Sequence, residues 1–409
     1  MSSARHRNIR RKIKEIAIGT VAVLTMTVPM LSTSATAQEE TDGFQVTFLV
    51  SDLSNIAAKN PADPDLVNPW GLTTSSTSPF WVSDNNAGVA TLYNTSGTKQ
   101  GLTVSIPNPV DPCGAVGTPT GTVFNITIVG TTGGFNIPPK TPTAPARFLF
   151  ATEDGTIVGW NPAVNPAGCA GQAGTFGIIA VDNSGNNFTN PDPASQTGAV
   201  YKGLAIATDS TGRTLLYATN FRAGTIDVFG PDFKPPVPAL PAGAFTDPSL
   251  PDGYAPFNIV EIEGKLVVTY AKQNATRHDD VAGQSHGFVN IFNLDGSGLQ
   301  RFAQRDQLNS PWGVALAPAS FGEFAGDLLI GNFGNGHINA FDLAKGRFIN
   351  KVRDPFGQAI VIDGLWSLRV GSGNANGGAA DKVYFTAGPF GETHGLFGSL
   401  CSVQSSTCP

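Results

Sequence analysis

The sequence is poor in charge and cysteine, and no segment after its first residues has sustained helical periodicity. Only 14% of the 409 residues are charged, and the few lysines and arginines are scattered. This argues against nucleic acid or an anionic membrane as a partner. No C-x-x-C spacing occurs among the four cysteines, so neither a zinc site nor a thioredoxin-like motif is supported. The 48 glycines and 30 prolines separate short β-rich runs, which is typical of an all-β protein.

The N-terminus has the pattern of a signal peptide. Basic residues 5–14 precede the apolar run 16–31, and Ala35-Thr36-Ala37 is an A-x-A cleavage candidate. The run is short and interrupted by threonines and Pro29, so we expect Sec export of a secreted or periplasmic protein rather than a retained anchor or a stable membrane span. Removal of residues 1–37 leaves 19 basic and 30 acidic residues, a net charge near −11 that permits cation binding without requiring it.

The cysteines of an exported chain are expected to form disulfides. Cys113 and Cys169 lie in two loops rich in Gly, Pro and Ala, and Cys401 and Cys408 lie in the C-terminal tail. Of the three possible pairings, we favour 113–169 with 401–408.

A repeated unit of short strands is the most informative feature of the sequence. Aligned units begin at Gly71, Leu149, Gly203, Asn258, Gly313 and Ser367, at intervals of 78, 54, 55, 55 and 54 residues. Each unit contains three short strands, and several contain a fourth, outer strand. Six such units predict a six-bladed β-propeller over residues 44–400, followed by a tail at 401–409.

Closure of the propeller is predicted from the two ends of this region. The last unit supplies three strands, and the alternating apolar segment Phe44–Ser51 precedes the first unit. We expect this N-terminal strand to complete the sixth blade as its outer strand, which leaves no free edge there.

Several motifs resemble an uncharacterised family of secreted bacterial β-propellers that is distantly similar to NHL-repeat proteins. They are NPWGL, YAKQ…HDDVAG…GFV, SPWGVALAP, IGNFGNGHINAFD, DGLWSL and YFTAGP…HGLFG. The resemblance covers most of residues 45–400 and implies the fold and export, but no established activity, so no catalytic residues are carried over.

One face of the predicted propeller should collect the polar residues. The loops that enter the innermost strands and the turns between second and third strands open together around the central channel. The segment Lys272–Gly287 is such a turn, enlarged enough to stand over the channel mouth. The residues expected to bind a small-molecule ligand or an extracellular protein there are Asn68, Trp70, Arg147, Lys202, Asn258, Lys272, His278, Asp280, Trp312, Asp363, Trp366 and His394.

Two metal hypotheses compete with simple binding. Oxygen ligands for Ca²⁺ from several blades could support a divalent-cation-dependent hydrolase or lactonase acting on a small substrate at the channel. The candidate ligands are Asp84, Glu153, Asn220, Asp279 and Asn332. His278 and His286, with Asp279 or Asp280, could instead hold a transition metal. The alternative is that Asp and Asn at these turns bond local backbone.

Two further patterns carry less weight. The G-Q-S-H-G sequence around Ser285 matches a nucleophile elbow, but a strand follows it and no helix does, so we do not expect a nucleophile there. The recurring Trp70, Trp312 and Trp366 could stack on a flat ligand, although packing between blades is the commoner role of repeated aromatic residues. The favoured function is therefore binding at the channel mouth, with the Ca²⁺-dependent hydrolase as the alternative.

Overall fold

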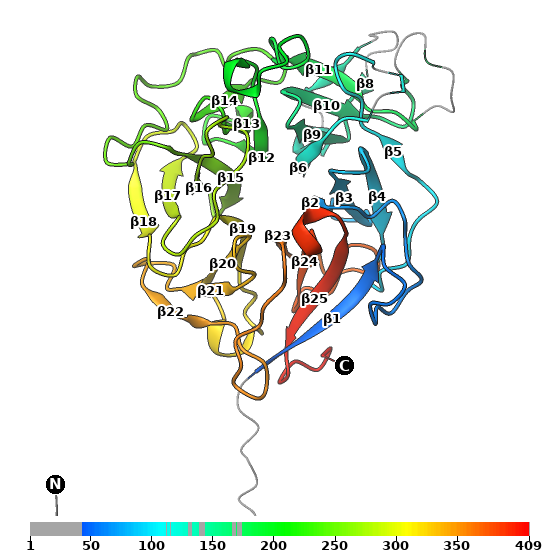
Figure 1. The fold of residues 1–409 in the computed structure, drawn as a ribbon, viewed down its shortest axis with the longest axis vertical. Coiled ribbons are helices and arrows are strands. Elements are labelled where there is room, and N and C mark those ends of the chain that lie inside the picture. The colour runs from blue at the N-terminus through cyan, green and yellow to red at the C-terminus, as the bar shows by residue number, and fades with distance from the viewer. Residues whose placement is uncertain are drawn as a thin grey trace, which may run out of the picture. The chain divides into compact units, whose positions relative to one another are not determined.

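The structure, a computed structural model, describes residues 43–111, 113–114, 116–129, 133–138, 144–165, 169 and 174–408. The described chain forms a six-bladed β-propeller, as predicted (Figure 1). The signal peptide predicted for residues 1–37 lies outside the described residues. Within the described part, no helix is both long and apolar enough to cross a membrane.

Each blade is an antiparallel sheet whose first strand lies at the central channel. The innermost strands are β2 (Pro69–Thr73), β6 (Pro119–Phe124), β12 (Tyr201–Thr208), β15 (Tyr254–Ile262), β19 (Pro311–Leu316) and β23 (Leu365–Val370). The second strands are β3 (Phe80–Asp84), β9 (Phe148–Thr152), β13 (Thr214–Asn220), β16 (Lys265–Lys272), β20 (Leu328–Asn332) and β24 (Val383–Ala387). The third strands are β4 (Val89–Tyr93), β10 (Thr156–Trp160), β14 (Thr225–Phe229), β17 (Phe288–Asn293), β21 (Ile338–Phe341) and β25 (Leu396–Ser402).

Outer strands complete most blades. They are β5 (Val104–Ser105), β11 (Ile178–Asp182), β18 (Gln300–Gln304), β22 (Phe348–Lys351) and β1 (Phe44–Ser51), and the β12–β13–β14 blade has three strands among the described residues. Outside the blades lie the hairpin β7 (Asn136–Ile137) and β8 (Ala144–Pro145) and the short helices η1 (Ile126–Ile128), η2 (Pro193–Ser195), η3 (Gly322–Phe324) and α1 (Pro389–Glu392).

The second strands form the middle of each blade and are the most apolar. Strands β3 and β20 are buried at every residue, whereas the outer strand β22 is half-buried throughout. A blade packs between two neighbours, so both faces of its middle strands are covered and need apolar side chains. The core therefore consists of layers between blades rather than one central cluster.

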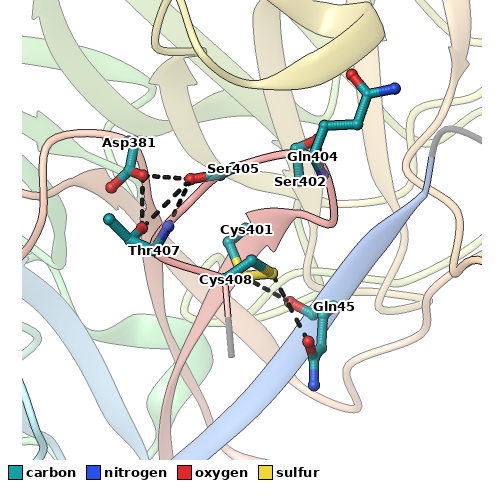
Figure 2. The surroundings of a disulfide bond; sticks show 8 residues. All are labelled: Gln45, Asp381, Cys401, Ser402, Gln404, Ser405, Thr407 and Cys408. Atoms are coloured by element: carbon teal, nitrogen blue, oxygen red, sulfur yellow. Dashed lines mark hydrogen bonds between the residues drawn. A yellow bond between two sulfur atoms is a disulfide. The ribbon is translucent and has the colours of Figure 1, made fainter.

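Closure of the ring agrees with the prediction. Strand β1 pairs with β25, with Phe44 opposite Ser402 and Ser51 opposite Leu396. The disulfides are Cys113–Cys169 and Cys401–Cys408, the favoured pairing. Figure 2 shows that the second disulfide folds the C-terminal tail back beside Gln45 of β1, so the disulfide and the backbone pairing of β1 with β25 secure the same blade.

The predicted start of the second blade was wrong. Leu149 belongs to β9, the second strand, and the innermost strand is β6, which contains Gly121. The segment 126–147 is therefore an insertion within this blade rather than a connection before it. Gly121 occupies the place of Gly71 in the first blade, because a Cβ on either residue would lie 2.4 Å from the neighbouring inner strand.

A β-bulge interrupts every innermost strand near the channel axis. In two blades, a threonine of the second strand bonds the backbone at the bulge and also bonds the next blade. The hydroxyl of Thr219 accepts the Gly203 N–H at 2.7 Å and donates to the Phe257 carbonyl of the next blade at 3.3 Å. The Thr386 hydroxyl accepts the Ser367 N–H at 3.1 Å and donates to the Trp70 carbonyl at 2.6 Å, which links the last blade to the first.

We predict that Gly121→Ala lowers the free energy of unfolding by about 2 kcal/mol or more, because the added methyl group would meet the backbone nitrogen of Leu204. Gly101→Ala is the matched control, since a Cβ there meets nothing within 4 Å. Urea unfolding followed by tryptophan fluorescence compares the two variants. Equal midpoints would show that β6 does not pack at the axis as described.

Candidate binding site at the channel mouth

Aromatic residues of four innermost strands close the central channel. Trp70 stacks on Trp366 with ring centroids 3.5 Å apart, and Trp312 meets both edge-on at 6.1 and 5.8 Å. Phe333 covers the other face of Trp366 at 3.9 Å, and Phe257 lies 6.0 Å from the same ring. All three tryptophans are buried, so the indole rings pack on one another across the axis and form the floor of the mouth.

Lys202 of β12 stands on this floor. Its side chain is almost fully buried, with its ammonium 5.0 Å from the Trp70 ring centroid and 5.9 Å from that of Phe221. The ammonium forms ion pairs with Glu153 and, at 3.5 Å, with Asp279. Burial alone would lower the pKa of Lys202, but the negative charges of Glu153 and Asp279 raise it above its ordinary value. The lysine therefore remains charged inside the protein.

The two carboxylates that pair with Lys202 come from different turns. Glu153 lies in the β9–β10 turn, where its second oxygen accepts a hydrogen bond from the Asn85 amide at 2.9 Å. Asp279 belongs to the β16–β17 loop, residues 273–287, and its Oδ1 lies 2.7 Å from His278 Nδ1. Burial acts to raise the pKa of Asp279, but His278 and Lys202 together bring it well below the ordinary value.

A second pair of carboxyl groups at the mouth has no cation of its own. Glu392 accepts a hydrogen bond from the Asn68 amide at 2.9 Å, and Asn68 in turn accepts one from the Trp366 indole at 2.9 Å. Burial raises the pKa of Glu392 and also that of Asp280 in the 273–287 loop. Neither carboxyl forms an ion pair with any described residue, and Oδ2 of Asp280 is buried without a hydrogen-bond partner.

The candidate calcium ligands divide into two groups. Glu153 and Asp279 converge, and with His278 they place one possible ligand atom each within 4.8 Å of one another. The other three lie at strand ends and bond to a neighbouring strand or connecting segment rather than to one another. Asp84 accepts from Thr91, Asn220 donates to Asp227 at 3.1 Å, and Asn332 donates to the Gln307 carbonyl at 2.7 Å.

The remaining expected site residues lie at varied distances from this centre. Arg147 lies before β9, at the opposite end of that strand from Glu153, because the second blade begins at β6. Asn258 lies below the floor and donates to the Trp312 carbonyl at 2.8 Å. Lys272 is exposed at the end of β16, Asp363 accepts from the Phe390 N–H at 2.8 Å, and His394 contacts Asp52 at 2.7 Å.

The enlarged loop contains the two remaining motif residues. His286 Nδ1 lies 2.8 Å from the Val281 carbonyl oxygen and is not part of the Glu153–His278–Asp279 group. Ser285 is followed by strand β17, as the sequence indicated.

Two residues of the floor were missed by the sequence analysis. Phe221 follows Asn220, and Phe333 follows Asn332, so the same Asn-Phe pair ends the second strand in two blades. This repetition was a usable signal for an aromatic residue that turns inward at the channel. Phe390 is exposed and lies beside His394 on the rim. It is not part of an Asn-Phe pair, so the sequence offered no comparable signal for it.

The fold and site define a propeller with an aromatic floor and an acidic mouth. No protein-family model matches the chain. Two uncharacterised proteins of Acanthamoeba polyphaga mimivirus are 31% identical over 362 residues and 33% identical over 367 residues. The alignments cover 88% of this chain and 81% and 86% of the viral chains, so the chain belongs to the family of these proteins. The relatives are viral, and the expected bacterial origin is therefore not supported.

Solved structures resemble the chain more distantly. The PQQ-bound aldose sugar dehydrogenase of Streptomyces coelicolor is 14% identical with a TM-score of 0.43, covering 88% of this chain and 99% of that chain. The virginiamycin B lyase of Staphylococcus aureus is 11% identical with a TM-score of 0.42, covering 88% and 98%. Similarity of this degree assigns no activity or ligand to this chain.

We predict that Lys202→Met lowers the free energy of unfolding by roughly 3 kcal/mol or more, because it leaves Glu153 buried without its partner. The double variant Lys202→Met/Glu153→Gln should recover part of this loss. Lys272→Met is the control, since Lys272 is exposed. Denaturant unfolding of these proteins and of the single variant Glu153→Gln completes the cycle, and purely additive effects would contradict the coupling.

A second prediction concerns Asp154, whose pKa burial raises to about 6. The folded state then binds a proton more tightly than the unfolded chain, so stability falls as pH rises from about 4 to about 6. Asp154→Asn removes this titration while keeping an oxygen for the Thr118 N–H. The variant should therefore gain stability relative to the parent between pH 4.5 and pH 7.5 in urea unfolding. A difference independent of pH would contradict this assignment.

Proposed function

We propose that this propeller binds a small organic cation at its channel mouth, beneath the 273–287 loop. The observation that carries the proposal is an excess of carboxyl groups around one lysine. The single positive charge of Lys202 is shared by its ion pairs with Glu153 and Asp279, whereas Asp280 and Glu392 form no ion pair with any described residue. A ligand with a positive charge would supply the missing counter-charge and favour ionisation of both groups.

The exposed groups around the mouth suggest what else the ligand carries. The Asp279 side chain is 59% exposed, and Phe390 on the rim is 61% exposed. The floor is filled by buried indole rings, so a ligand would lie above it rather than between them. An ammonium group on an apolar skeleton fits an acidic centre beside an exposed aromatic ring.

The 273–287 loop is held in place over the mouth. The Val281 N–H donates to the Lys272 carbonyl at 2.7 Å, which closes the base of the loop. The Gly283 N–H donates to the Asn309 side chain at 2.7 Å, which fastens the loop to the segment entering β19. Such attachment supports a pre-formed site, because less ordering remains to be done on binding.

The second candidate function is the divalent-cation-dependent hydrolase. It is favoured by the convergence of Glu153, His278 and Asp279 within 4.8 Å. The Lys202 ammonium already pairs with both carboxylates, and its positive charge would repel a metal ion held by the same oxygens. We therefore place the organic cation first.

We also propose that the protein works outside the reducing cytosol, in the envelope or secreted. The two disulfides support this, since such bonds persist chiefly in oxidising compartments. An amine on an exposed segment of an extracellular protein would contact the same carboxyl groups of the mouth as a small amine does.

Isothermal titration with n-hexylammonium and, separately, with Ca²⁺ tests the proposal. We expect n-hexylammonium to bind, and Asp280→Asn and Glu392→Gln each to weaken it about tenfold, because each removes a negative charge. Glu263→Gln, in the exposed β15–β16 turn, is the control and should bind normally.

Two outcomes would overturn the proposal. Absence of heat with n-hexylammonium, or binding unchanged in both mouth variants, excludes the site as described. Binding of Ca²⁺ alone, lost in Asp279→Asn, would favour the metal-dependent alternative instead.

A further inference from the structure

The opposite end of the central channel contains a separate cavity of about 240 Å³. It lies below the aromatic floor, and all six innermost strands contribute to its wall. One aliphatic side chain from each strand illustrates this: Leu72, Val123, Leu204, Ile259, Val314 and Leu368. The cavity is therefore lined by all six blades.

Arg369 of β23 brings a positive charge into this wall, which also contains the polar side chains of Thr122, Asn258 and Ser367. Its Nη2 donates to the carbonyl and hydroxyl oxygens of Thr74 at 3.3 and 3.4 Å. Its Nε is buried and has no hydrogen-bond partner, and no described carboxylate forms an ion pair with the guanidinium. The other charged residue on the wall, Glu261, accepts the Gly264 N–H at 2.7 Å within its own turn.

The guanidinium remains charged in spite of its surroundings. Burial lowers the pKa of Arg369 to about 10, which still leaves it protonated at neutral pH. The side chain is half-buried and its Nε is out of reach of solvent, and a charged group in such surroundings is normally paired. Lys202, at the other end of the channel, has two carboxylates within reach, so the absence of one at Arg369 is specific to this cavity.

We propose that this cavity binds a small organic carboxylate, with Arg369 holding the carboxylate and the aliphatic ring enclosing the rest of the molecule. A guanidinium presents parallel N–H groups that match the two oxygens of a carboxylate. The walls offer one cation, one carboxylate that bonds within its own turn, and aliphatic beside hydroxyl groups, which suits a monoanion with an apolar body better than a phosphate dianion. The volume restricts the ligand to a few carbon atoms or one ring.

A route into the cavity is present on the face away from the mouth. A second hollow, of about 510 Å³, shares Val260, Glu261, Val314, Leu368 and Arg369 with the first. Arg369 and Glu261 thus both lie where the two hollows meet, and Arg369 is the group there that would attract an anion. This site is independent of the acidic mouth, and either can fail without the other.

Titration with benzoate and hexanoate tests the proposal on the full chain, with heat and tryptophan fluorescence as readouts because Trp312 lines the cavity. We expect both acids to bind, with the affinity reduced at least tenfold in Arg369→Met. Arg369→Lys keeps the positive charge but lacks the parallel N–H groups of the guanidinium, so this variant should bind both acids with intermediate affinity. Arg147→Met removes an exposed arginine elsewhere and should bind as the parent does.

Thermal unfolding without ligand provides the second measurement. Arg369→Met should be at least as stable as the parent, because a half-buried charge without an ion-pair partner is replaced by an apolar side chain. No binding of either acid, equal binding by Arg369→Met, or tighter binding of inorganic phosphate than of benzoate would each overturn the proposal. A large loss of stability in Arg369→Met would also do so, since it would show that the arginine is a structural element.

Discussion

The close approach of the six innermost strands at the channel axis is the constraint on which the rest of the structure depends. A Cβ on Gly71, Gly121 or Gly203 would lie 2.4 Å from the neighbouring inner strand, so glycine is required where these strands converge. The bulges leave backbone N–H groups outside the strand ladder, and threonine hydroxyls of β13 and β24 accept from them and donate to a carbonyl of the next blade. Hydrogen bonds therefore join neighbouring blades at the axis, in addition to the packing of side chains between them.

This convergence divides the channel into two chemically different ends. The bulges turn Trp70, Trp312 and Trp366 inward just above the tightest point, where they pack into a floor. Polar side chains from the turns gather above it, and aliphatic side chains of the continuing strands enclose the cavity below it. The acidic mouth and the arginine-bearing cavity are thus separated by buried indole rings, and charge at one end has little influence on the other.

The architecture could be predicted from the sequence because propeller repeats are local patterns. Six units, the closing strand Phe44–Ser51 and the enlarged turn before β17 all follow from strand spacing. The start of the second blade was missed because its inner strand lacks the tryptophan of β2 and is separated from β9 by an insertion. The partners of Lys202 could not be predicted, since Glu153 and Asp279 come from two other blades and no spacing relates them. Arg369 was visible as one cation in an apolar strand, but its lack of a partner is a property of the assembled channel.

The contrast between Lys202 and Arg369 bears on why each residue is retained. Lys202 is stabilised by the carboxylates that it pairs with, so its loss should weaken the fold and its role at the mouth is partly structural. Arg369 has hydrogen bonds to Thr74 alone, which do not neutralise its charge. A residue that opposes folding and lines a cavity is more simply explained as a ligand-binding residue than as one that stabilises the fold. The same argument applies in weaker form to Asp280 and Glu392, because a carboxyl can take up a proton when unpaired and an arginine cannot readily release one.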